Sequence, residues 1–166
     1  MEKRLKYKKY CFVPYNLSDK QKMIQAGHAS EEYDWKYHNE EDYKSFFTYD
    51  KTWIVLNGGT SNDGHLGNPL GTMNEIYREI KNNGIHHSVF YEPDINSALT
   101  AICFLADERV WDYETYPDFI ENEIIYISPE GTPYDVQYRK YEDWEKSIGG
   151  KKNAFIRNLI KNKKLA

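Results

Sequence analysis

The chain has 166 residues, of which 40% are hydrophobic and 16% aromatic, so it is near the size of one domain and is not a disordered chain. No apolar run approaches the ~18 residues that span a bilayer, and no apolar stretch of a secretory signal follows the basic N-terminus. We therefore expect a cytoplasmic protein. The net charge of −4 is uneven, with +4 on residues 1–9, +6 on residues 149–166 and −14 between them. The basic ends are suited either to phosphate contacts or simply to solvation of frayed termini.

The first predicted elements are a strand and a helix joined by a polar turn. The apolar run 10–15 is typical of a strand, and Ser18 with Gln21 forms a capping-box pattern that starts a helix. Residues 25–30 of this helix are mostly small, which lets a helix lie close against a sheet. The polar turn then lies at the carboxyl end of a strand, where open α/β sheets bind their ligands.

The following pattern alternates between helix and strand. Hydrophobic periodicity and turn residues predict a short helix over 40–47, strands over 52–57, 87–91 and 98–105, and a helix that Thr72 and Glu75 cap and that ends at Asn83. Between the second strand and this helix, residues 58–71 hold five of the ten glycines. They lack the Lys-Ser/Thr pair of a phosphate loop, which argues against a nucleotide triphosphatase and favours a mobile binding loop or lid.

Residues 107–166 continue beyond this alternating pattern. We predict a helix over 134–148 with one apolar stripe, an end at Gly149-Gly150, and a last basic helix. The apolar faces of both helices are expected to pack on the preceding core, so residues 107–166 extend a single domain that spans 1–166.

Two cysteines, Cys11 and Cys103, lie inside the predicted apolar strands. We expect both to be buried, reduced thiols, as in most cytoplasmic proteins. The chain has no Cys-x-x-Cys pair, so a zinc ribbon is excluded and no metal site is predicted.

Two segments together resemble the type II peptidyl-tRNA hydrolase family over residues 8–106. The first carries the family's Gln-x-x-His-Ala helix pattern at Gln25, His28 and Ala29, and the second contains a Gly-Ile strand, an acidic loop and Thr100. The resemblance implies an α/β fold, a three-layer α/β/α sandwich. Its sheet would be four-stranded and mixed, in the order 2-1-4-3, with strand 4 antiparallel. It also implies hydrolysis of the ester between a peptide, or an N-blocked amino acid, and tRNA, without a cofactor.

The resemblance also implies where the reaction would take place. The family's helix lysine falls on Gln21, so Lys20 or Lys22 would supply its charge, and Lys20 is preferred because it lies at the start of the helix. The family's acid corresponds to Glu92 or Asp94, and its strand-opening threonine to Thr100. The residues expected to contact the substrate are Asn16, Gln21, Gln25, His28 and Asn96.

Each of these residues also has a purely structural explanation, as a solvated lysine, a turn former, a strand former or a packing histidine. The alternative function is a catalytically inactive binding module for a nucleotide, RNA or protein. Gln21, in place of the family's lysine, and the shortened acidic loop 92–97 favour this alternative. The expected partner is tRNA or another acylated nucleotide. Two further partners remain open: a second copy of the chain in a homodimer, and a protein that binds the C-terminal extension. The abundance of Lys, Asn, Tyr and Ile is typical of an AT-rich genome, such as that of a bacteriophage.

Overall fold

The fold is taken from a computed structural model that describes residues 4–61, 71–126 and 137–166. The expected loop 58–71 therefore lies largely outside the described residues. A π-helical turn, Phe46–Asp50, continues α2 (Glu41–Ser45), and a 3-10 turn, Pro93–Ile95, follows β3 (His87–Glu92). The elements in chain order are β1 (Tyr7–Val13), α1 (Asp19–Tyr37), α2 (Glu41–Ser45), β2 (Thr52–Asn57), α3 (Thr72–Asn82), β3 (His87–Glu92), β4 (Ala98–Asp107), α4 (Glu108–Trp111), β5 (Ile124–Tyr126), β6 (Gln137–Tyr138), α5 (Tyr141–Ser147) and α6 (Lys151–Ile160).

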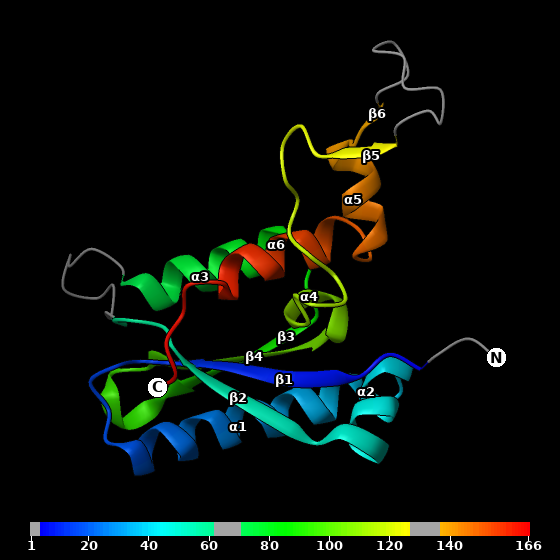
Figure 1. The fold of residues 1–166 in the computed structure, drawn as a ribbon. Coiled ribbons are helices and arrows are strands. Elements are labelled where there is room, and N and C mark those ends of the chain that lie inside the picture. Colours follow the sequence, from blue (N-terminus) through cyan, green and yellow to red (C-terminus); the bar gives the residue numbers. More distant parts are fainter. Residues whose placement is uncertain (1–3, 62–70, 127–136) are drawn as a thin grey trace.

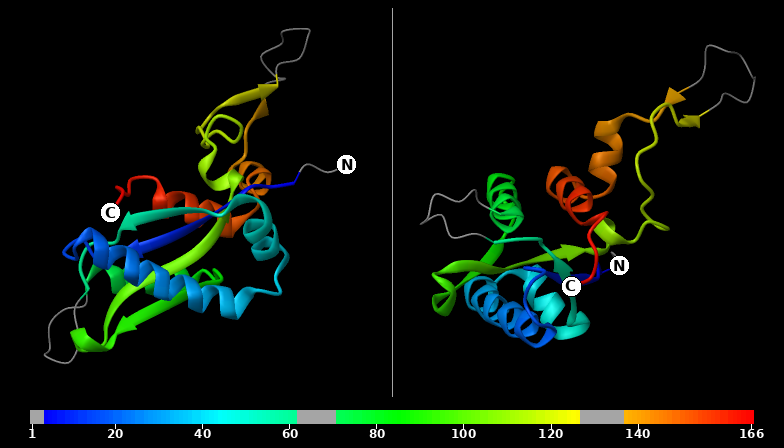
Figure 2. Two further views of the ribbon diagram at one scale, coloured as in Figure 1. Left: turned by 90° about the horizontal axis from the view of Figure 1, so that it is seen from below. Right: turned by 90° about the vertical axis from the view of Figure 1, so that its left-hand side faces the viewer.

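The central sheet has four strands in the order β2-β1-β4-β3. β1 and β2 are parallel, and β4 is antiparallel to both of its neighbours, so the predicted strand order and directions are confirmed. In Figures 1 and 2, α1 and α2 cover one face of this sheet, and α3 and α6 cover the other. The sheet is thus the middle of three layers, and its strands alternate side chains between two apolar cores.

The small residues of α1 place this helix close to the sheet. Ala26 and Ala29 are fully buried, and the Ser88 hydroxyl of β3 donates a hydrogen bond to the Ala29 carbonyl. The helix begins with the predicted capping box: the backbone N–H of Gln21 donates to Ser18 Oγ at 3.3 Å, and the backbone N–H of Ser18 donates to Gln21 Oε1 at 3.2 Å. Local sequence therefore fixes both the start of α1 and its packed face.

Gly27 lies on α1 but is not needed for this close packing, because a Cβ atom built there meets no heavy atom within 4 Å. We expect Gly27→Ala to raise the free energy of unfolding by about 0.5–1 kcal/mol, since alanine restricts the unfolded chain and favours the helix. Urea unfolding measures the change. Gly84→Ala is the matched control: Gly84 has φ +64°, so the same substitution should cost about 1 kcal/mol there. Destabilisation by Gly27→Ala would contradict the packing described for α1.

Two predicted helix starts are wrong. Gly71, not Thr72, is the N-cap of α3; the Thr72 hydroxyl donates instead to the Gly58 carbonyl at 2.7 Å and accepts from the Thr60 N–H at 3.0 Å. This hydroxyl ties the start of α3 to the end of β2, a contact that local sequence does not reveal. α5 begins only at Tyr141, because Gln137–Tyr138 pairs with β5 as a strand.

The C-terminal region contacts the core through α6 and the final residues. Ile156 of α6 belongs to the core cluster that contains Phe12 and Phe104. Leu165 forms a bridge with Leu56 of β2, so the C-terminal segment lies along the outer edge of that strand. The treatment of 107–166 as an extension of one domain remains a prediction, and these contacts favour it.

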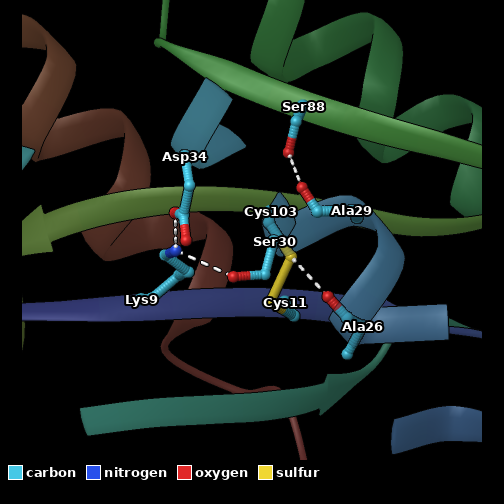
Figure 3. Close-up of a disulfide and its surroundings, with 8 residues drawn as sticks. All are labelled: Lys9, Cys11, Ala26, Ala29, Ser30, Asp34, Ser88 and Cys103. Atoms are coloured by element: carbon cyan, nitrogen blue, oxygen red, sulfur yellow. Dashed lines mark hydrogen bonds and ion pairs between the residues drawn. A yellow bond between two sulfur atoms is a disulfide. The ribbon is translucent and has the colours of Figure 1, made fainter. Parts of the chain in front are cut away.

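The cysteine expectation is only half right. Cys11 and Cys103 are both fully buried, as predicted, but the structure joins them in a disulfide instead of leaving reduced thiols (Figure 3). The two residues are direct partners across β1 and β4, with their Cα atoms 4.3 Å apart. Pairing follows from the register of two strands separated by 92 positions, which the sequence alone does not give.

A buried lysine lies on the same face of β1. The Lys9 side chain is 1% exposed, forms an ion pair with Asp34 and donates to Ser30 Oγ at 2.8 Å (Figure 3). Its ammonium lies 5.1–5.7 Å from four aromatic ring centroids, those of Tyr33, Tyr43, Phe46 and Trp53. Burial lowers the pKa of Lys9 below its ordinary value, while the Asp34 carboxylate opposes this change. Asp34 thus stabilises a charge that water cannot reach.

Candidate functional site

A hydrogen-bonded side-chain cluster lies where α1 crosses the turn between β3 and β4. Thr100 is the member of this cluster that comes from β4, and it occupies a β-bulge in that strand. Phe90 pairs with Ala101 and Tyr91 pairs with Leu99, so Thr100 is an extra residue in β4. A bulge re-aims a side chain, and here the Thr100 hydroxyl reaches Gln25 on α1.

Three predicted site residues form one continuous chain of hydrogen bonds. The Thr100 hydroxyl donates to Gln25 Oε1 at 2.7 Å, and Gln25 Nε2 donates to Glu92 Oε2 at 2.6 Å. Thr100 and Gln25 are only 2% and 6% exposed, whereas Glu92 is half-buried. Because the amide of Gln25 accepts at one end and donates at the other, it links the carboxylate of Glu92 to the hydroxyl of Thr100.

The loop between β3 and β4 brings Glu92, and not Asp94, to this chain. Asp94 is exposed, and its backbone N–H points to Glu92 Oε1 at 3.5 Å. Asn96 is exposed as well and has φ +51°, a left-handed conformation that asparagine tolerates better than most residues. Backbone geometry therefore accounts for Asn96, and the acid of the candidate site is Glu92.

The two candidate lysines differ in position. Lys20 is exposed, whereas the Lys22 side chain is only 13% exposed, with its ammonium 3.5 Å from the solvent-exposed Asp19 carboxylate. Lys22 lies one turn before Gln25 on α1, so its position favours it over Lys20. Gln21 is occupied by the capping box, and Asn16 is exposed in the turn before α1.

His28 extends the cluster along α1. Its exposed ring stacks on Phe90 with centroids 4.5 Å apart and planes 27° apart, so the packing role expected from sequence is present. Phe90 was not predicted, although it contributes both this ring and the carbonyl that the Thr100 hydroxyl approaches at 3.3 Å. The sequence signal that could have identified it is only its place in the strand before the acidic loop.

Beside the cluster is a groove of about 510 Å³, lined by two aromatic rings, a histidine and two carboxylates. We name it the His28–Phe90 groove; its lining residues are His28, Glu31, Glu32, Trp35 and Phe90. Trp35, which is 77% exposed, and the two glutamates were not predicted as site residues. Their positions on α1 resemble an ordinary solvated helix face until the edge strand β3 is placed next to them.

Within the described ranges, no group of three or more His, Cys, Asp or Glu side chains is arranged to hold a metal ion. No described helix has both the length and the apolar character needed to cross a membrane. Comparison with protein-family models and with curated proteins finds no match for this chain.

Proposed function

We propose that the chain hydrolyses the ester that joins a peptide or an N-blocked amino acid to tRNA or another acylated nucleotide. The observation that carries this proposal is the hydrogen-bonded chain Thr100–Gln25–Glu92. The strand order β2-β1-β4-β3 supports it further, because the resemblance to type II peptidyl-tRNA hydrolases implies the same order.

The chemistry assigns a role to each group. The Thr100 hydroxyl donates a hydrogen bond to Gln25. The lone pairs of the Thr100 oxygen can therefore accept a hydrogen bond from the attacking water and orient it. Water oxygen bonds to the ester carbonyl carbon, and a water proton passes to the Glu92 carboxylate. When the carbon–oxygen bond to the ribose breaks, that proton goes to the leaving ribose oxygen. The products are a free carboxylic acid and a free hydroxyl on the nucleotide.

Lys22 is assigned to the developing negative charge or to the terminal phosphate of the nucleotide, since an ammonium attracts both. We expect Lys22→Ala to lower kcat/KM for tRNA release from N-acetyl-aminoacyl-tRNA about tenfold or more. Lys20→Ala is the matched control and should change it less than threefold, because Lys20 is exposed to solvent, which screens its charge. If Lys20→Ala gives the larger loss, the assignment of the cation is wrong.

A second candidate is a binding module without catalysis. It is favoured by one observation: Gln21, at the position of the family's lysine, is neutral and occupied by the capping box. The two candidates differ in the release assay. Turnover of N-acetyl-aminoacyl-tRNA above the uncatalysed rate supports the hydrolase, and its absence, with retained tRNA binding, supports the binding module.

A further inference from the structure

The His28–Phe90 groove adjoins the hydrogen-bonded cluster. Its Phe90 ring belongs to the same residue whose carbonyl oxygen lies 3.3 Å from the Thr100 hydroxyl oxygen. His28 follows Gln25 at i+3 on α1, so both point to one edge of the helix. A group bound in the groove would therefore lie beside a residue that contacts Thr100.

The chemistry of the groove indicates a cation. Trp35, Phe90 and His28 supply aromatic faces, and Trp35 is exposed to an extent that is unusual for a tryptophan in a folded protein. In the described part of the chain, neither Glu31 nor Glu32 forms an ion pair or a side-chain hydrogen bond. Aromatic faces with unpaired carboxylates are the combination that binds a guanidinium or an ammonium group.

The same charges decide which half of the substrate enters the groove. A tRNA carries one negative charge per nucleotide, and the two carboxylates would repel it. The acyl half carries no phosphate and can carry a positive side chain. Arginine suits the groove better than lysine, because its planar guanidinium stacks on aromatic rings and pairs with carboxylates at the same time.

We propose that the His28–Phe90 groove holds the acyl part of the substrate and prefers a cationic side chain, arginine above all, on the residue that carries the ester. This inference rests on the proposed function for its connection to the ester. The preference of the groove for a cation can be tested without any ester.

The binding test uses N-acetyl-argininamide and its uncharged analogue N-acetyl-citrullinamide, with the Trp35 indole N–H signal followed by NMR. The Trp35→Phe variant identifies that signal. We expect the arginine compound to bind about tenfold more tightly, and the difference to disappear in Glu31→Gln/Glu32→Gln. The charge-matched control is Glu75→Gln/Glu79→Gln on α3, across the sheet, which should keep the preference. Equal binding of the two compounds, or tighter binding of AMP than of either, would overturn the inference.

The hydrolysis test compares N-acetyl-arginyl-tRNA with N-acetyl-leucyl-tRNA. We expect the ratio of their kcat/KM values to fall about tenfold in Glu31→Gln/Glu32→Gln relative to wild type, while Glu75→Gln/Glu79→Gln leaves it unchanged. Turnover of both substrates with an unchanged ratio would overturn the groove assignment and leave the hydrolase standing. Turnover of neither substrate would reject the hydrolase, and with it the acyl-part assignment, while the binding test still decides the groove's preference for a cation.

Discussion

Thr100→Val is expected to lower kcat for tRNA release about 100-fold, because valine keeps the volume of threonine but removes the oxygen that orients the attacking water. It also leaves Gln25 Oε1 without its 2.7 Å donor. That buried oxygen should cost about 1–3 kcal/mol in the free energy of unfolding. The release assay at saturating substrate measures kcat, and urea unfolding of the same preparation shows that the variant is folded.

Ser88→Ala is the matched control for Thr100→Val. It also removes a buried hydroxyl that bonds to α1, but its partner is the Ala29 carbonyl and not a member of the Thr100–Gln25–Glu92 chain. It should lose a comparable amount of stability and keep kcat within about threefold of wild type, since the lost hydrogen bond lies outside the proposed site. Equal kcat in Thr100→Val and wild type would remove Thr100 from the mechanism.

Asp34→Ala is expected to lower the free energy of unfolding by about 2–3 kcal/mol. Removing one partner of a buried ion pair leaves an uncompensated charge, which costs about 3–5 kcal/mol when both partners are buried. Here the Lys9 side chain is 1% exposed but Asp34 is 36% exposed, so the expected loss is smaller. Equilibrium urea unfolding at pH 7 measures it.

Lys9→Met/Asp34→Ala tests the physical reason for that loss. Methionine fills the aromatic surroundings of Lys9 without a charge, so the double variant should recover most of the stability that Asp34→Ala loses. If the double variant is less stable than Asp34→Ala alone, the loss is due to packing and not to an isolated ammonium.

The parts of this fold that could be predicted depend on local sequence or on the family resemblance. The capping box of Ser18 and Gln21 and the small face of α1 involve neighbours in sequence, so the pattern was sufficient. The strand order followed from the resemblance. The stop after α5 followed from Gly149 and Gly150, which have φ +95° and +94°.

The unpredicted parts depend on register between distant strands. The disulfide needs Cys11 opposite Cys103, and the re-aimed Thr100 needs one extra residue in β4; neither feature leaves a local signal. The choice between Glu92 and Asp94 depended on the turn after β3, and the choice between Lys20 and Lys22 on which lysine α1 turns away from solvent. For the same reason, Trp35 and its groove emerged only when β3 was placed beside α1.

The most direct test of the Thr100–Gln25–Glu92 site is a single-turnover measurement with protein in excess over N-acetyl-aminoacyl-tRNA, following the release of free tRNA. If these three residues form a hydrolytic site, wild-type protein releases tRNA far faster than buffer alone, and Glu92→Gln removes most of that acceleration. Release at the uncatalysed rate by folded wild-type protein that still binds the substrate would contradict a hydrolytic site and leave a binding module on this fold.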